Sequence, residues 1–211
     1  MKRRDFFKKI LSISALGMTS IFAGVSLYTA LSRVKIKKIS LPIRRLPAGF
    51  AGFKIVQLTD LHIGPTIGRS WVEQIVKQVN DLKPDLIAIT GDLVDGSVSR
   101  LAEEVAPLKY LKAKHGVFFV TGNHEYYAGV DEWLLHLNQQ LGMRVLRNET
   151  IAVSLSSGES IDLTGVDDHS SSAFSGHGPD LKKALTSRNL SNPVILLAHQ
   201  PIAIKESAEY D

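Results

Sequence analysis

The sequence contains no cysteine among its 211 residues. Disulfide bonds and thiolate metal sites are therefore excluded, and a bound metal ion would need histidine, aspartate, glutamate or asparagine as ligands. Low-complexity tracts and internal repeats are also absent. The remaining composition, 44% hydrophobic and 22% charged, is that of a globular protein with room for one domain and an appendage.

Acidic residues are almost missing from the first fifty positions, which contain eleven lysines and arginines and a single acid, Asp5. The rest of the chain contains fourteen basic and twenty acidic residues. The formal net charge of +4 therefore describes the N-terminal segment and not the folded part. We expect no nucleic-acid partner.

Charge is absent from residues 10–31, a run of twenty-two residues that is long enough to span a bilayer. A buried core helix is the alternative, but such a helix usually has a polar stripe, and this run has only scattered serines and threonines. The run therefore predicts an N-terminal apolar helix that serves as a signal or a membrane anchor.

Residues 1–9 form a basic segment in front of this run. Arg3 and Arg4 are followed by Phe6, Phe7 and Lys8, a pattern that resembles the twin-arginine export signal of bacteria. We expect the protein at the extracytoplasmic face of the cell membrane or exported by this route. Cleavage of the segment and its retention as an anchor are both open.

Residues 32–50 contain six basic residues and no acid. They form either a solvated linker with an edge strand or a basic collar that binds anionic lipid through residues 33–45. Because the stretch directly follows the apolar run, the collar is favoured. Attraction to anionic lipid would contribute about 1 kcal/mol of binding free energy for each basic residue near the membrane surface.

From residue 51 onward, short apolar runs alternate with helical patterns. Strands are predicted at 53–59, 86–90 and 116–121, and helices at 69–82, 100–114 and 131–141. This order predicts an α/β domain with a largely parallel sheet. A hairpin at 149–166, a polar loop at 168–179, a short helix at 180–188 and a last strand at 193–199 follow.

Polar residues follow four of these strands, at the point where each strand ends. They are Asp60 and His62, then Asp92 and Asp95, then Asn123 and His124, and finally His199. In parallel α/β sheets, ligands bind beyond the carboxyl ends of the strands, and neighbouring strands lie about 4.8 Å apart. Each group alone has a plain explanation as a turn or helix cap, but four such groups favour a shared site.

The donors at these strand ends are carboxylates, imidazoles and an amide. Such oxygen and nitrogen ligands suit manganese, iron or zinc, and manganese is favoured. A set of this size, with a carboxylate that can bridge, predicts two divalent ions roughly 3.5–4 Å apart.

The motifs TDLH, GDLVD, GNHE and AHQP, in this order, resemble those of the calcineurin-like metallophosphoesterases. The likeness covers about residues 39–211 and is strongest to the twin-arginine-exported or membrane-associated bacterial members. It implies that residues 51–211 form an incomplete four-layer α-β-β-α sandwich. It also implies hydrolysis of phosphomono- or diesters by attack of a metal-bridging hydroxide.

The resemblance assigns a role to each motif residue. Asp60 and His62 would bind the first metal, Asp92 would bind both metals, and Asn123 and His199 would bind the second.

Two further residues would be catalytic. His124 would face the scissile phosphate and stabilise charge or protonate the leaving oxygen, while Asp95 would orient it. Glu125 receives no role.

The family's last motif, Gly-His-x-His, does not occur in this sequence. In the family it gives one ligand to each metal, and the other histidines, at 115, 136, 169 and 177, do not replace it. We therefore expect a C-terminally truncated chain. A catalytically impaired metal-binding remnant and a membrane-surface module remain alternatives to an active, monomeric phosphoesterase. Its substrate is open; lipid-linked and cell-wall-linked phosphates are both compatible.

Overall fold

The computed structural model describes residues 34–210 and divides the chain into two units, Met1–Ile39 and Ser40–Asp211. In the first unit, the described residues 34–39 are exposed and form neither helix nor strand. The predicted apolar helix at residues 10–31 lies outside the described residues. Within residues 34–210, no helix combines the length and the apolar character needed to cross a membrane.

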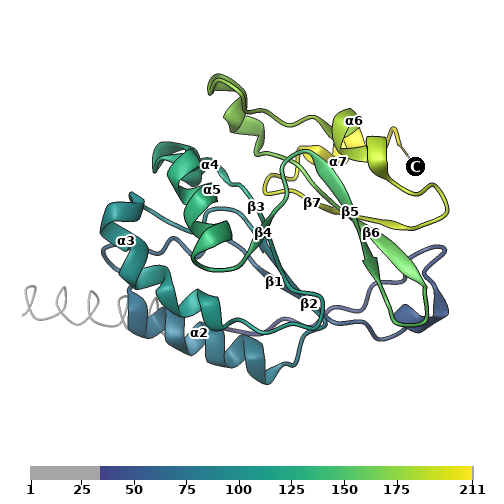
Figure 1. Cartoon of the computed structure of the whole chain (residues 1–211), viewed down its shortest axis with the longest axis horizontal. Coiled ribbons are helices and arrows are strands. Elements are labelled where there is room, and N and C mark those ends of the chain that lie inside the picture. The colour runs from purple at the N-terminus through teal and green to yellow at the C-terminus, as the bar shows by residue number, and fades with distance from the viewer. Residues whose placement is uncertain (1–33, 211) are drawn as a thin grey trace, which may run out of the picture. The chain divides into compact units, whose positions relative to one another are not determined.

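A four-stranded parallel sheet forms the centre of the second unit (Figure 1). Its strands, in spatial order, are β1 (Ile55–Leu58), β2 (Leu86–Thr90), β3 (Val117–Val120) and β4 (Arg144–Val145). Every residue of β2 is buried, as expected for an apolar strand with neighbours on both faces. The predicted α/β fold with a parallel sheet is confirmed.

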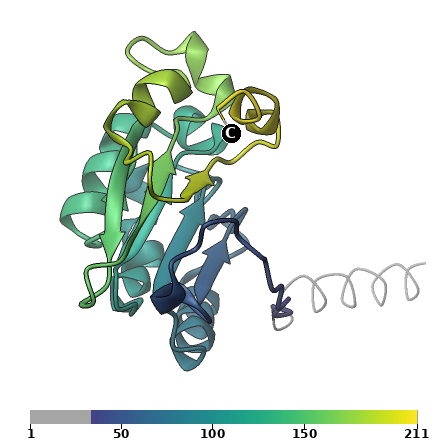
Figure 2. The same cartoon turned by 90° about the vertical axis from the view of Figure 1, so that its right-hand side faces the viewer.

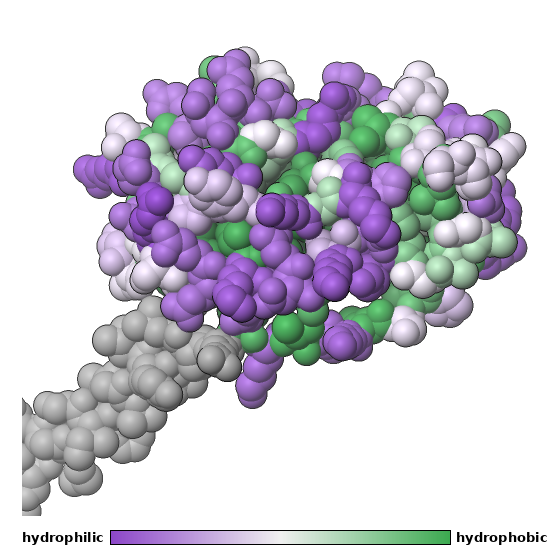
Figure 3. Space-filling model, turned by 60° about the horizontal axis from the view of Figure 1, so that its bottom comes forward, coloured by the Kyte–Doolittle hydropathy of each residue, from purple (hydrophilic) through white to green (hydrophobic). Residues whose placement is uncertain are grey.

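Helices α2 (Arg69–Asp81), α3 (Val98–Val105) and α5 (Val130–Gln139) cover one face of this sheet (Figure 1). Their apolar residues form a core cluster with the sheet, in which Trp133 and Leu137 are fully buried. The polar residues of α2 point outward. In Figure 3, hydrophilic residues cover the left part of the face turned forward, and hydrophobic residues lie among them toward the right.

The helix predicted over 100–114 is shorter than expected. It begins at Val98, ends at Val105 and continues as a 3-10 segment, η2 (Ala106–Tyr110), with Pro107 near its start. Proline has no amide hydrogen and clashes with the preceding turn, which explains why the α-helix stops there. The short elements β4 and α4 (Asn123–Tyr127) were not predicted, because neither is long enough to show a periodic pattern.

The second sheet has three strands, β5 (Glu149–Ser154), β6 (Ser160–Gly165) and β7 (Val194–Leu197). The predicted hairpin is confirmed, because β5 and β6 pair in antiparallel register from Glu149 opposite Gly165 to Ser154 opposite Ser160. The last strand, β7, pairs in parallel with β6 and so belongs to this sheet and not to the first.

The two sheets pack face to face (Figure 2). Side chains from β2 and β3 meet those of β5, β6 and β7 in a core that includes Phe118, Leu146 and Leu163. On the outer face of the second sheet, α6 (Leu181–Ala184) and α7 (Ala203–Ser207) accompany a smaller cluster around Val166. The order of layers is therefore helix, sheet, sheet, helix, with a small fourth layer.

Leu163 provides a test of the core between the sheets, since it is fully buried. We expect Leu163→Ala to lower the free energy of unfolding by about 2–5 kcal/mol, because it leaves a cavity in a packed interior. Leu190→Ala is the matched control, since Leu190 is 72% exposed. Urea denaturation of both variants measures the difference, and equal losses would contradict the described core.

Candidate metal centre

The loops after β1 and β2 run side by side beyond the ends of their strands. The amide nitrogens of Asp60, His62 and Ile63 donate hydrogen bonds to the carbonyls of Gly91, Asp92 and Leu93, at 3.1, 3.0 and 2.9 Å.

An isolated parallel bridge between Ile63 and Val94 completes this pairing. The backbone itself therefore holds the polar residues of the first two motifs next to each other.

Three residues of these loops have left-handed backbone conformations. Asp60, His62 and Asp92 have φ values of 54°, 45° and 52°. This region is uncommon for residues other than glycine, and it costs of order 1–3 kcal/mol where the surroundings impose it. Strain of this kind clusters at functional sites. In this chain it turns three of the predicted ligands toward a common point.

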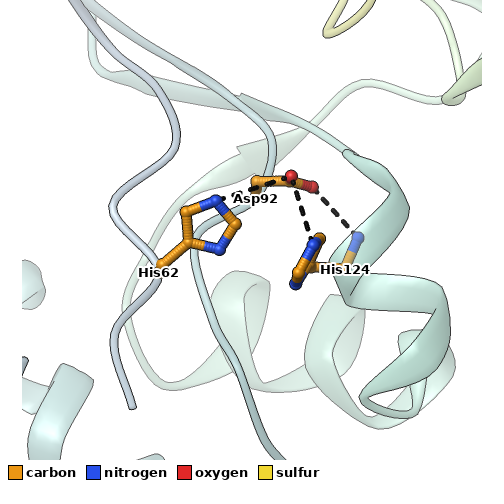
Figure 4. A group of neighbouring side chains, drawn as sticks. All are labelled: His62, Asp92 and His124. Carbon is orange, nitrogen blue, oxygen red and sulfur yellow. Dashed lines mark hydrogen bonds and ion pairs between the residues drawn. The ribbon is translucent and has the colours of Figure 1, made fainter. Parts of the chain in front are cut away.

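The carboxylate of Asp92 lies at that point (Figure 4). Its Oδ2 atom is 3.8 Å from Nε2 of His62, 3.8 Å from Nε2 of His124 and 3.4 Å from Nε2 of His199. Oδ1 of the same carboxylate accepts a hydrogen bond of 3.0 Å from the amide nitrogen of His124. Asp92 is almost fully buried, at 4% exposure.

The other ring nitrogen of each histidine is held by a hydrogen-bond partner. Nδ1 of His62 and Nδ1 of His124 lie 3.0 and 2.6 Å from the same oxygen of Asp95. Nδ1 of His199 donates to the carbonyl of Thr90 at 2.8 Å. A fixed Nδ1 turns the Nε2 atom of each ring toward Asp92, where it can bind a metal ion or, in a histidine that is not a ligand, transfer a proton.

The charges around Asp92 also fit bound cations. A carbonyl oxygen only accepts, so Nδ1 of His199 carries the hydrogen, and Nε2 presents either a lone pair or a second proton to the carboxylate. A lone pair that faces a carboxylate oxygen at 3.4 Å is repelled unless a cation lies between them. A lone pair on Nε2 of His199 therefore suits a cation between this ring and Asp92.

The donor atoms divide into two groups that share Asp92. One contains His62, Asp92 and His124, and the other contains Asp60, Asp92 and His199, with the donor atoms of each group within 4.8 Å of one another. Carboxylate oxygens and imidazole nitrogens suit divalent transition metals. The residues present thus fit two ions on either side of one carboxylate.

The structure brings together five of the residues that the motifs singled out as ligands or catalytic groups: Asp60, His62, Asp92, His124 and His199. Asp95 lies beside them. Asn123 is the first residue of α4, directly before His124. The separate roles assigned to His124 and Asn123 stay predictions. The sequence argument was wrong in placing the four strand ends along one sheet, because His199 follows β7 of the second sheet.

Asp95 has more contacts than the sequence suggested, since it bonds His62 as well as His124. Burial raises the pKa of its carboxyl, but the hydrogen bonds from the two histidines outweigh this, and the pKa lies below the ordinary value.

For His62, burial disfavours the charged ring. The hydrogen bond to Asp95 and the nearby carboxylates prevail, so its pKa is raised.

A cavity of about 240 Å³ adjoins the cluster at the ends of β6 and β7, with His199 in its wall. Its other polar lining residues include Asp168, His169 and Gln200. Asp168 is 2% exposed, and among the described residues its Oδ2 atom has no hydrogen-bond partner.

The sequence model of one protein family, the calcineurin-like phosphoesterases, matches residues 53–211 of this chain. A bovine transmembrane protein with a metallophosphoesterase domain is 39% identical over 203 residues, which are 92% of this chain and 46% of that protein. An uncharacterized metallophosphoesterase of Helicobacter pylori is 39% identical over 182 residues, which are 86% of this chain and 47% of that protein.

A putative metallophosphoesterase of Caenorhabditis elegans is 42% identical, with 93% of this chain and 40% of that protein covered. The chain therefore spans about half the length of these relatives. They include animal as well as bacterial proteins, so the likeness is broader than the bacterial type that the sequence suggested.

A substitution at Gly91 tests the contact between the loops after β2 and β3. Gly91 has a φ of 85°, and a Cβ atom there would collide with the backbone of Gly122 in the loop after β3. Gly116, with a φ of 99° and only an ordinary van der Waals contact with the Phe118 side chain, is the matched control. We expect Gly116→Ala to lower the free energy of unfolding by about 1–3 kcal/mol from backbone strain alone.

Gly91→Ala should lower the free energy of unfolding clearly more and should also weaken Mn²⁺ binding, because its side chain pushes the loops after β2 and β3 apart. Thermal unfolding and calorimetric Mn²⁺ titration measure the two effects. Equal behaviour of both variants would contradict the described contact between the loops.

Proposed function

The chain belongs to the calcineurin-like phosphoesterase family, a family of metal-dependent hydrolases, and we propose that it cleaves phosphate esters at the cluster around Asp92. The observation that carries this proposal is the set of three histidines whose Nε2 atoms lie 3.4–3.8 Å from one oxygen of Asp92. His62 and His199 of this set, together with Asp60 and Asp92, suit two divalent ions, for which we favour Mn²⁺ over iron and zinc, and His124 is left for proton transfer.

Two divalent ions bound there would polarise the phosphate and lower the pKa of bound water toward about 7. The chain's own residues supply orientation and proton transfer. The backbone of His124 fixes one oxygen of Asp92, so the other oxygen faces the histidines. Asp95 fixes the ring of His124 through Nδ1, so that Nε2 of this ring is placed to donate a proton to the leaving oxygen.

The cavity beside His199 suits the part of the substrate beyond the phosphate. It is lined by apolar residues such as Val166 and Leu196 and by the polar groups of Asp168 and Gln200. The polar side chain of Gln200 in the same wall can form a hydrogen bond with a hydroxyl or amine on the leaving group. A lipid-linked or cell-wall-linked phosphate ester has such hydroxyl groups next to the phosphate, and we propose this class as substrate.

We place this activity at the outer face of the cytoplasmic membrane. The support for this is the uncharged run at residues 10–31, the twin-arginine pattern before it and the basic residues 33–45 after it. The name of the bovine relative, a transmembrane protein with a metallophosphoesterase domain, agrees with a membrane location.

Metal binding without turnover is a second candidate function for the same cluster. The described cluster offers two three-residue groups for cations. Metal binding together with undetectable hydrolysis would favour this second function over the first.

The main test is hydrolysis of an aryl phosphodiester by the full chain with added Mn²⁺. We expect activity that a chelator abolishes and that falls at least about a hundredfold in His124→Ala and Asp92→Asn, because these changes remove the proposed acid and the shared ligand. His115→Ala is the control, since His115 precedes β3 at the opposite end of the sheet. Unchanged turnover in the first two variants would contradict the proposal.

Binding of lipid vesicles tests the basic collar. Neutralising Lys35, Lys37 and Lys38 to glutamine should weaken binding to phosphatidylserine vesicles roughly a hundredfold, from about 1 kcal/mol for each charge.

The same change at three exposed lysines of the folded unit, Lys83, Lys109 and Lys112, is the matched control and should have a smaller effect. Equal binding of the two triple variants would rule out the collar.

A further inference from the structure

Glu125 is a fully buried carboxylate that the proposed chemistry does not use. It directly follows His124 in the first turn of α4. Burial raises its pKa to about 6, against the opposing effect of hydrogen bonds from backbone amides. An ionisable group held in the interior needs a compensating set of partners, and those partners identify its task.

The carboxylate of Glu125 accepts three backbone hydrogen bonds from two different loops. Oε2 accepts from the amides of Asp92 and Gly122, at 3.0 and 2.7 Å, and Oε1 accepts from the amide of Leu93 at 2.8 Å. Asp92 and Leu93 follow β2, while Gly122 follows β3. One side chain therefore joins the ends of two neighbouring strands.

These two loops are in direct contact at the point that Glu125 joins. A Cβ atom on Gly122 would collide with Oδ1 of Asp92, and one on Gly91 would collide with the backbone of Gly122. Within this contact the amide of His124 donates to Oδ1 of Asp92. A small shift between the loops would therefore rotate the Asp92 carboxylate away from the three histidines.

We propose that Glu125 is a positioning residue, which joins the loops after β2 and β3 and thereby sets the direction of the Asp92 carboxylate toward the metal ions. This inference rests on the proposed function, because it concerns the same metal centre. Glu125 acts through the backbone of Asp92 and Gly122 and touches neither ion nor substrate.

A carboxylate is required because the site offers three donors and no acceptor. An ionised carboxylate only accepts and has about four lone-pair positions on two oxygens. The amide of glutamine has nearly the same shape, but its NH₂ group would face one or two backbone N–H groups. At least one buried donor would then lose its partner, at about 1–3 kcal/mol.

Asp85 provides the matched control at the opposite end of β2. Its side chain accepts a hydrogen bond of 2.8 Å from the backbone amide of Lys54 and pairs with Lys114 at 2.7 Å. Asp85→Asn thus also removes a carboxylate that holds backbone, but far from the metal centre. It reports the loss of stability alone.

The experiment compares Mn²⁺ titrations and electron paramagnetic resonance spectra of the wild-type full chain, Glu125→Gln and Asp85→Asn. We expect both variants to unfold at lower temperature. Only Glu125→Gln should bind Mn²⁺ about 10–100-fold more weakly and lose the spectrum of two coupled ions, since groups that orient ligands typically have effects of this size. Glu125→Asp, which keeps the charge, should recover part of the affinity, and Glu125→Ala replaces Glu125→Gln if the latter does not fold.

The outcomes separate this inference from the proposed function. Wild-type affinity and spectrum in folded Glu125→Gln, or in Glu125→Ala where glutamine does not fold, would overturn the positioning role and leave the phosphoesterase proposal intact. Equal weakening by Asp85→Asn would also overturn it, because general destabilisation would then explain the effect. A wild-type chain that binds no Mn²⁺ would overturn the proposed metal centre and this inference with it.

Discussion

The candidate metal centre depends on one buried carboxylate, that of Asp92, and on the contacts that fix the direction of this carboxylate. The residue has a left-handed backbone, its amide is held by Glu125, and one of its oxygens is held by the amide of His124. The remaining oxygen faces three imidazole nitrogens. A carboxylate as deeply buried as that of Asp92 is costly unless hydrogen bonds and cations compensate it.

The fold serves this site by bringing the carboxyl ends of strands from two sheets to one place. The parallel register of β1, β2 and β3 delivers the first three motifs in neighbouring loops. The packing of the second sheet on the first then delivers His199, whose ring donates to Thr90 at the end of β2. The histidine that ends the last strand is therefore fixed by a contact with the first sheet.

The sequence predicted the α/β class, the β5–β6 hairpin and the residues that gather around Asp92, because buried strands and the polar residues after them are local patterns. It could not show that β7 belongs to the second sheet, since pairing between distant strands leaves no local signal. It also gave no role to Glu125 and only one partner to Asp95. Those roles depend on hydrogen bonds between residues 29–33 positions apart in the chain, which leave no local pattern in the sequence.

The shared position of Asp92 between two cations is the central claim, and anomalous scattering from crystals of the full chain grown with Mn²⁺ tests it most directly. We predict two manganese peaks roughly 3.5–4 Å apart, on either side of the Asp92 carboxylate, with Nε2 of His62 bound to one and Nε2 of His199 bound to the other. A map with no peak at Asp92, or with a single peak that leaves His199 without a metal, would contradict it.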